Sequence, residues 1–145
     1  MYQRILIATD GSELAEKGVS AGLELAKALG AHVTIVTVTQ PWTIAVPGEM
    51  AVAFPVKEYE QAAQQEAKTI LGKATKTAES YGLTCDTRHI PDAYAADGII
   101  EAQKDDKSDL IVMASHGRSG LTRVVLGSQA SAVVSQSSVP VLICR

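Results

Sequence analysis

Residues 3–12 read QRILIATDGS, a short apolar run that ends in the polar, glycine-containing triplet Asp10-Gly11-Ser12. A run that is apolar on both faces is typical of a central strand in a parallel sheet, because helices cover both sides of such a sheet. Ser12 can cap a helix, and apolar residues then recur at helical spacing until Gly30. The stretch therefore predicts a buried strand followed by a helix, the first unit of a parallel α/β fold.

The rest of the chain continues this alternation of strands and helices. Strands are predicted over residues 3–9, 32–39, 83–90, 109–114 and 139–144, and helices over residues 14–29, 56–80, 93–104 and 128–136. Polar residues alternate in the third strand, which indicates an edge of the sheet. Residues 117–126 are predicted to form a loop. The order predicts a single α/β domain with an open, mainly parallel five-stranded sheet and helices on both faces.

Residues 40–54 form the longest stretch without a periodic pattern, and they include Pro41, Pro47 and Gly48. We expect this segment to be irregular and, because it is apolar, to pack over another part of the molecule. Trp42 and Phe54 could cover a bound base or could equally pack onto the core.

The chain has 145 residues, of which 46% are hydrophobic, and a formal net charge of −3. This length suits one packed domain, and the charge argues against binding to nucleic acid or to an anionic membrane. No apolar run approaches the roughly 18 residues of a membrane span, and the N-terminus lacks a secretory pattern. We therefore expect a cytoplasmic protein with reduced thiols. Cys85 and Cys144 are expected to be small buried strand residues, since the cysteines and histidines lack the spacing of a zinc site.

Three predicted strands end in residues that could contact a ligand. Asp10 follows the first strand, Val38 lies at the end of the second, and residues 114–120 follow the fourth. In open α/β sheets, ligands bind outside the carboxyl ends of the strands, where the winding direction switches. We therefore expect these three ends on one rim.

Residues 114–128 read ASHGRSGLTRVVLGS and combine the features of a phosphate-binding loop. Glycines allow close backbone approach, guanidinium and hydroxyl groups can bond phosphate oxygens, and the helix start at Gly127-Ser128 favours an anion. The loop residues concerned are Gly117, Gly120, Arg118, Arg123, Ser115, Ser119 and Thr122. An ordinary turn-rich loop with a serine helix cap is the open alternative. The chain has neither a Gly-Lys-Ser/Thr loop nor a Gly-x-Gly-x-x-Gly motif after the first strand.

Four stretches in order, ILIATDGS at 5–12, DLIVMASHGRSG at 109–120, LGS at 126–128 and VPVLI at 139–143, together resemble the universal stress protein (UspA-type) family. The resemblance covers residues 1–145 as one universal stress protein domain, and it implies a Rossmann-like fold of the adenine nucleotide alpha hydrolase type. The family's ATP-binding branch carries Gly, two residues, Gly, nine residues and then Gly-Ser or Gly-Thr. Ala114 stands where that pattern has its first glycine.

The resemblance implies that an adenine nucleotide (ATP, AMP or ADP) binds along the rim. Val38 would meet adenine through its backbone, and Asp10 would lie near the ribose or near a Mg²⁺ bound through the phosphates. The other residues that would line the nucleoside pocket or hold ribose and phosphates are Ala8, Thr9, Ala114, His116, Gly117, Gly127, Ser128 and Gln129. Arg118, Gly120 and Arg123 are added to them on charge and backbone freedom. The resemblance also implies a homodimer that pairs through residues 139–144.

Plainer roles remain open for individual residues, and three functions remain open for the chain. Asp10 could serve only to begin a helix, and a loop histidine such as His116 more often packs than acts as a general acid or base. The leading function is a nucleotide-binding regulatory or stress-response protein with an unknown partner protein. Slow ATP hydrolysis is the second, although no base or P-loop lysine is visible. The third is a nucleotide-independent dimeric interaction module, which Ala114 favours.

Overall fold

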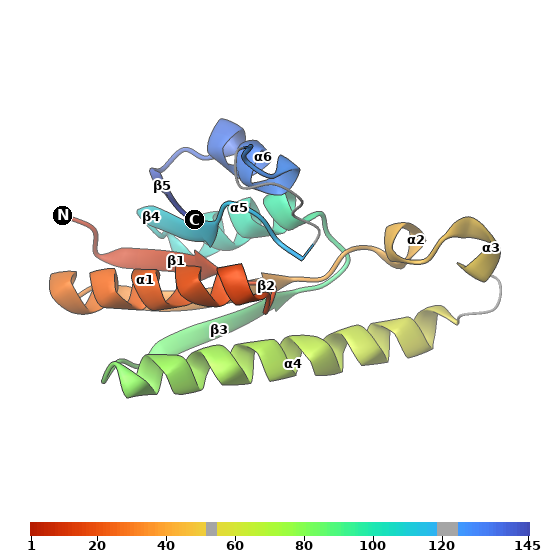
Figure 1. Cartoon of the computed structure of the whole chain (residues 1–145), viewed down its shortest axis with the longest axis horizontal. Helices are drawn as coiled ribbons and strands as arrows, with labels where there is room; N and C mark the ends of the chain where they lie inside the picture. Colours follow the sequence, from red (N-terminus) through yellow and green to blue (C-terminus); the bar gives the residue numbers. More distant parts are fainter. Residues whose placement is uncertain (52–54, 119–124) are drawn as a thin grey trace.

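Five parallel strands form a sheet in the order β3-β2-β1-β4-β5 (Figure 1). The computed structural model describes residues 1–51, 55–118 and 125–145. The strands are β1 (Arg4–Ala8), β2 (His32–Val38), β3 (Cys85–Ile90), β4 (Leu110–Ala114) and β5 (Val141–Cys144). Strand β1, which is apolar from Ile5 to Ala8, lies at the centre and the more polar β3 lies at one edge, which confirms the predicted fold class.

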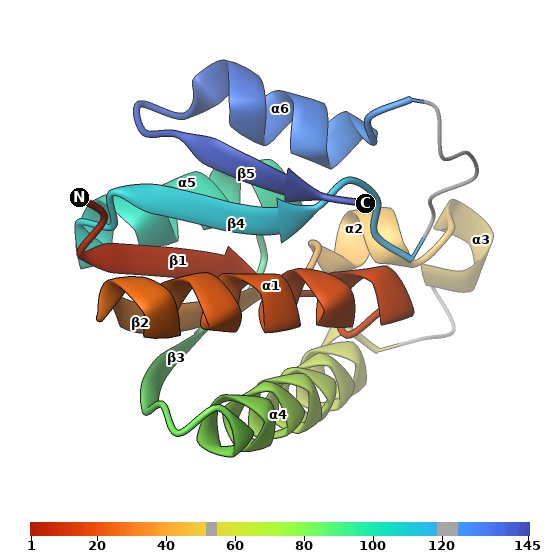
Figure 2. The ribbon, with the colours of Figure 1, turned by 60° about the vertical axis from the view of Figure 1, so that its left-hand side comes forward.

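Helices cover both faces of the sheet (Figure 2). They are α1 (Glu13–Leu29), α4 (Val56–Ser80), α5 (Ala95–Asp106) and α6 (Ser128–Gln136). Successive residues of β1 point to opposite faces, so Ile5 and Ile7 join the core under α1 and α4. Leu6 and Ala8 join the core under α5 and α6. Both faces of β1 are thus buried, as its sequence predicts.

Helix α1 lies close against the sheet and has the predicted ends. The Ser12 hydroxyl accepts a hydrogen bond from the Ala15 N–H at 3.2 Å, and Gly30 ends the helix in the left-handed region with φ of 64°. A Cβ at Gly22 would lie 2.6 Å from Ile7 Cδ1, and one at Gly18 would lie 3.4 Å from the Ala114 nitrogen. These two glycines therefore let the helix approach β1 and β4, which places the Ser12 end near the end of β4.

Residues 40–54 correct an expectation, because their described part is not irregular. It contains two single-turn helices, α2 (Trp42–Ala45) and α3 (Gly48–Ala51), each of which follows a proline. Four residues are too few for a periodic pattern to reveal a helix. The segment packs against another part of the molecule only in part: α2 lies against α4 and the Gln40 carbonyl accepts from Tyr59, whereas Ile44 and Met50 are 44% and 62% exposed. Both helices project from the sheet beside the start of α4 (Figure 1).

The last strand is shorter than expected and begins at Val141 rather than at residue 139. Pro140 has no N–H to donate, although its carbonyl still accepts from the Ile111 N–H at 3.0 Å.

The cysteines correct another expectation: Cys85 and Cys144 are partly rather than fully buried. Burial nevertheless raises the pKa of both thiols. None of the described helices combines the length and the apolar character that crossing a membrane requires.

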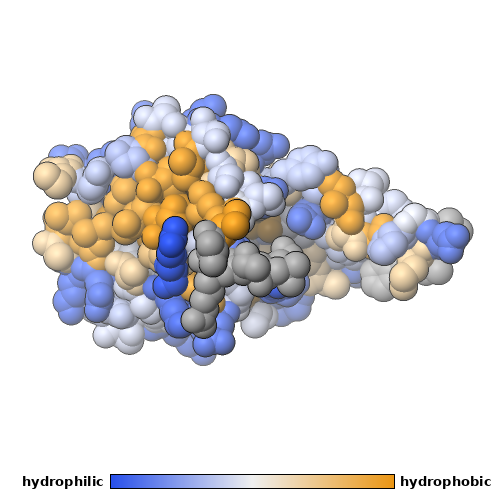
Figure 3. All heavy atoms as spheres, turned by 45° about the horizontal axis from the view of Figure 1, so that its top comes forward, coloured by the Kyte–Doolittle hydropathy of each residue, from blue (hydrophilic) through white to orange (hydrophobic). Residues whose placement is uncertain are grey.

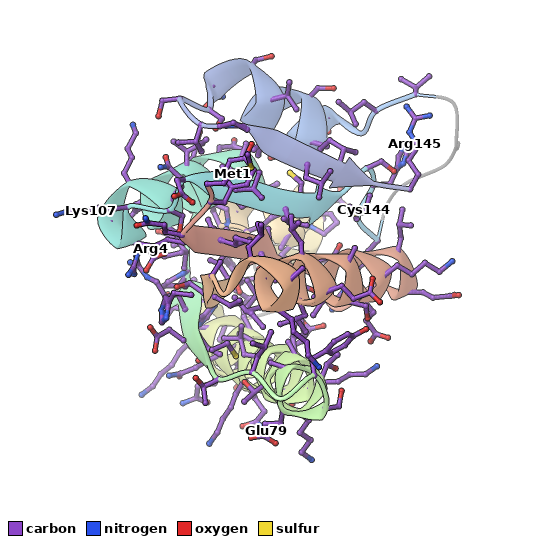
Figure 4. The ribbon with its side chains drawn as sticks, turned by 90° about the vertical axis from the view of Figure 1, so that its left-hand side faces the viewer. Met1, Arg4, Glu79, Lys107, Cys144 and Arg145 are labelled. Atoms are coloured by element: carbon purple, nitrogen blue, oxygen red, sulfur yellow. The ribbon has the colours of Figure 1, made fainter. Side chains whose placement is uncertain are left out.

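A polar cluster joins the amino ends of β1 and β4, at the opposite end of the sheet from Cys144 and Arg145 (Figure 4). The Asp109 carboxylate accepts from the N–H groups of Gln3 and Arg4, at 2.9 and 3.1 Å. The Arg4 guanidinium donates to Asp106 at 2.7 Å. Bonds from Ser108 and Arg4 lower the pKa of Asp106 against the effect of its burial, and the two backbone bonds likewise lower that of Asp109. The cluster therefore stabilises this end of the sheet through ionised carboxylates.

Candidate functional site

A cleft of about 640 Å³ opens at the carboxyl ends of β1, β2 and β4, the rim that the sequence predicts. The predicted site residues that line it are Ala8, Thr9, Asp10, Val38, Ala114, His116, Gly117, Arg118, Gly127, Ser128 and Gln129. Gly120 and Arg123 lie outside the described residues. Trp42 does not line the cleft, and Phe54 also lies outside the described residues. The chain thus brings together predicted residues that are more than 100 positions apart in sequence.

The floor of the cleft is a notch that exists because the pairing of β1 stops before β2 and β4 end at this rim. The pairing of β1 with β2 ends at Ala8↔Val36, and its pairing with β4 ends at Ile7↔Val112. The Thr9 N–H makes a last bond to the Val36 carbonyl at 3.0 Å. Peptide groups alternate between the two neighbouring strands, so those of Val38 and Ala114 turn toward β1, beyond its last paired residue. Backbone donors and acceptors therefore face the cleft from both sides.

Asp10 ties two loops of the rim together. One carboxylate oxygen accepts from the Ser12 N–H at 2.9 Å, and the other accepts from the Arg118 N–H at 2.9 Å. Asp10 thus holds the turn that leads into α1, in line with the plainer interpretation, and it also fixes the loop that follows β4. A Cβ on Gly117 would lie 2.6 Å from Asp10 Oδ2. The side-chain-free Gly117 is therefore what allows the loop to lie against this carboxylate.

The start of α6 presents to the cleft backbone donors that have no acceptor within the helix. The first intrahelical bond runs from the Ser131 N–H to the Gly127 carbonyl at 2.8 Å. The earlier N–H groups of the helix, including those of Ser128 and Gln129, have no intrahelical acceptor. Ser128 is the first helical residue, and the cap position belongs to Gly127, which makes no side-chain cap bond. The alternative of an ordinary serine cap is therefore wrong.

Gly127 also holds the helix close to β4. Its N–H donates to the Ser115 carbonyl at 2.9 Å, and a Cβ at this position would lie 2.8 Å from the same oxygen. The Ser115 N–H in turn donates to the Cys144 carbonyl at 2.8 Å, which continues the bonds between β4 and β5. Because Gly117 and Gly127 lack a Cβ, the loop after β4 and the start of α6 can pack this closely, and this packing sets the shape of the rim.

The Gln129 side chain has a role that the sequence does not reveal. Its Oε1 accepts from the Ala96 N–H at 3.0 Å, in the first turn of α5. The α5 cap residue, Tyr94, makes no side-chain cap bond, so Gln129 replaces it from another helix. The side chain of Gln129 is thus engaged in the fold, while its N–H remains at the cleft.

Helix α4 forms the wall opposite the glycine-containing loop, and this wall was missed from the sequence. Its lining residues are Tyr59, Ala63, Glu66, Ala67 and Ile70. Apart from Glu66, these residues lie on the apolar stripe of an amphipathic helix, and the small residues Ala63 and Ala67 on that stripe could have signalled an open wall. The Tyr59 hydroxyl donates to the Gln40 carbonyl at 2.8 Å. Burial, followed by the charges of Glu66 and Asp92, raises the pKa of Tyr59.

Polar side chains at the rim are also paired with one another. His116 Nδ1 lies 3.0 Å from the Ser115 hydroxyl, and Arg118 Nη1 lies 2.6 Å from Glu66 Oε1. Thr39 Oγ1 lies 2.7 Å from His89 Nε2, and burial lowers the pKa of that histidine. Arg118 therefore reaches across the cleft and pairs with Glu66 on α4. From the sequence we expected its guanidinium to bind phosphate oxygens.

Comparisons with known proteins agree with this architecture. The model of the universal stress protein family matches residues 1–145. A universal stress protein of Methanocaldococcus jannaschii is 30% identical over 147 residues, covering 100% of this chain and 83% of the relative. The structure of UspA from Lactobacillus plantarum matches with a TM-score of 0.84 at 22% identity, covering 99% of this chain and 98% of that one. A universal stress protein solved in complex with cAMP matches with a TM-score of 0.75 at 24% identity, covering 99% and 97%.

Proposed function

The chain belongs to the universal stress protein family, and from this membership we propose that it binds an adenine nucleotide in the cleft and acts as a regulatory or stress-response protein. One observation carries the proposal: the same cleft joins the backbone notch at Val38 to the amino end of α6. Its volume of about 640 Å³ lies within the range of small-molecule sites, roughly 300–1,000 Å³. The similar protein solved with cAMP supports an adenine nucleotide as the ligand.

We assign the base to the Val38 end of the cleft. An adenine edge offers both a hydrogen-bond donor and an acceptor, which a peptide N–H and C=O can match. The Val38 peptide group turns toward the notch, where β1 no longer pairs with it. Apolar side chains nearby, among them Ala8, Ile99 and Met113, line the cleft and can pack on the faces of the ring.

We assign the phosphates to the start of α6. The N–H groups of Ser128, Gln129 and Ala130 lack intrahelical acceptors, and the helix dipole favours an anion at this end. Gly117 and Gly127 let the loop after β4 lie close to Asp10 and the start of α6 lie close to the Ser115 carbonyl, which keeps these backbone donors beside the cleft. The site therefore depends on backbone donors rather than on a lysine.

Ala114 is compatible with this site, although the family's ATP-binding pattern has a glycine there. Ala114 ends β4 in regular strand geometry and is 7% exposed. It alternates with Ile111 and Met113, which face α5 and α6, so its methyl group belongs to the side covered by α1. On that side, Gly18 leaves room beside the strand. We therefore propose that the alanine is accommodated without closing the cleft.

The residues present do not fit a resident Mg²⁺ site. In the described part of the chain, no three His, Cys, Asp or Glu side chains gather as a metal site. Both oxygens of Asp10 already accept N–H bonds. We propose that any Mg²⁺ enters with the nucleotide and is held by its phosphates.

Binding, rather than hydrolysis, is the activity that the site supports. Among the described residues, the His116 ring bonds the Ser115 hydroxyl and not a carboxylate. A general base is ordinarily oriented by such a third group. We propose hydrolysis that is slow at most. A cytoplasmic location and an unknown partner protein stay predictions.

We also propose a homodimer that pairs through β5. This strand is an edge of the sheet, and an edge strand offers unpaired N–H and C=O groups to a second chain. Leu142 in the middle of β5 is 40% exposed. Apolar side chains gather on the face that carries β5 (Figure 3). An apolar edge of this kind is what a self-complementary interface requires.

Calorimetric titration of the full chain with ATP and Mg²⁺, AMP and cAMP tests the nucleotide proposal. We expect saturable binding at one site per chain, and loss of binding in Gly127→Val, whose side chain would meet the Ser115 carbonyl. Gly72→Ala is the matched control, because nothing lies within 4 Å of a Cβ at that position. No heat and no thermal shift at millimolar nucleotide would reject the proposal.

A further inference from the structure

We propose that Glu66 and Arg118 form an ion pair that the phosphates of the nucleotide must open, so that Glu66 sets how strongly phosphate charge contributes to affinity. This inference rests on the proposed nucleotide site. It concerns α4, which the sequence motifs do not include, and it makes Glu66 a specificity-determining residue of the cleft.

Arg118 contacts three separate parts of the rim. Its backbone N–H donates to Asp10 Oδ2 at 2.9 Å, which fixes its position at the end of β4. Its Nη2 passes 3.6 Å from the place where a Gly11 Cβ would be. Its Nη1 then reaches Glu66 Oε1 on α4 at 2.6 Å. The side chain therefore spans the mouth of the cleft, over the turn between β1 and α1.

The charges of the described lining residues disfavour an anion as long as this pair is closed. The charged side chains among the described lining residues are Asp10, Glu66 and Arg118, with His116 and Tyr59 as further titratable groups. Arg118 is therefore the one arginine or lysine among them, and Glu66 already neutralises it. An incoming phosphate meets two carboxylates and a guanidinium that is engaged elsewhere.

The pair is well suited to exchange one anion for another. The side chains of Arg118 and Glu66 are 54% and 55% exposed, and ion pairs in such positions contribute little to stability. A guanidinium binds phosphate through two parallel N–H bonds, which is a stronger arrangement than a single contact. Phosphate can therefore displace Glu66, and the displacement reduces the net affinity.

Glu66→Gln removes the competing charge and keeps the side-chain shape. We expect the affinity for ATP to rise about two- to fivefold, the factor that corresponds to an exposed ion pair. Adenosine offers the same base and ribose without phosphate, so its affinity should change less than about twofold. The matched control is Glu60→Gln, because Glu60 is exposed on the same helix and does not line the cleft. That variant should bind both ligands as the wild type does.

A double-mutant cycle separates competition for Arg118 from simple repulsion. In an Arg118→Gln background, Glu66→Gln should no longer strengthen ATP binding, because the contested guanidinium is gone. An equal gain in both backgrounds would overturn the inference and leave plain repulsion by Glu66. No gain in either background would overturn it as well. A wild-type chain that binds no adenine nucleotide would instead reject the proposed function itself, so the two failures are distinguishable.

Discussion

Replacing Gly117 by alanine tests the steric contact that shapes the rim. The added Cβ would lie 2.6 Å from Asp10 Oδ2, where ordinary contact begins at 3.4 Å. The two groups must therefore separate by about 0.8 Å. The Asp10 carboxylate is held by N–H bonds on both oxygens, and one of them comes from Arg118, next to the mutated residue. Relief of the contact thus stretches the Arg118 bond from 2.9 Å to beyond hydrogen-bonding distance.

The loss can be estimated from the bond that is broken. A hydrogen bond to a charged group contributes roughly 1.5–3 kcal/mol, and the lower end applies here because water can reach the loop. We therefore expect the free energy of unfolding to fall by about 1.5 kcal/mol and the melting temperature by roughly 5 °C. The loop is also displaced from the phosphate position, so nucleotide affinity should fall about tenfold.

Urea unfolding and calorimetry measure the two effects. Gly72→Ala adds the same methyl group to α4 with no atom within 4 Å, and it should leave stability unchanged or slightly raised. In an Asp10→Ala background the contact no longer exists, so adding Gly117→Ala should cost almost nothing further. The reasoning would be refuted if Gly117→Ala behaved like Gly72→Ala, or if its cost persisted without the Asp10 carboxylate.

Three further variants test other parts of the fold. Gln129→Ala removes the cap of α5 and should lower the free energy of unfolding by about 1 kcal/mol in urea; exposed Gln136→Ala is the control, and equal costs would contradict the capping role. The depressed pKa values of Asp106 and Asp109 stabilise the fold above about pH 4, and this stabilisation is lost as the pH falls through the folded-state values. Asp106→Asn should therefore flatten the acid limb of stability against pH, whereas a curve parallel to the wild type would argue against it. Leu142→Lys places a charge on the β5 edge and should give a monomer in sedimentation velocity, with Val56→Lys as an exposed apolar control; two dimeric variants would reject pairing through β5.

The main elements of the fold could be predicted because single short stretches determine them. The apolar run through Ile5 and Ile7 indicates a central strand, since both of its faces must be covered. Ser12 and Gly30 mark the ends of α1 through local backbone chemistry. The short helices α2 and α3 escaped prediction because one turn carries no periodicity. The start of β5 was placed too early because the apolar pattern runs through Pro140, which cannot donate to the sheet.

The site was predictable only where it follows the strand ends. Asp10, Val38 and Gly117 could be placed on one rim because the carboxyl ends of parallel strands meet there. The Asp10 bond to the Arg118 N–H joins residues 108 positions apart, and no local pattern signals it. Glu66 was also missed, because its place in the sequence is typical of the solvent-exposed face of an amphipathic helix. The cap that Gln129 gives to α5 depends on two helices meeting across 33 residues.

The early end of the pairing of β1 with β2 and β4 has a consequence for amide hydrogen exchange. Val38 and Ala114 end strands whose other amides are among the most buried in the molecule, yet their own peptide groups lie beyond the last paired residues of β1. Exchange at these two positions does not require the sheet to open, whereas exchange in the middle of the same strands does. The protein thus carries, within its most protected strands, two amides that exchange by a local route. A ligand that fills the notch would slow them without altering the rest of the sheet.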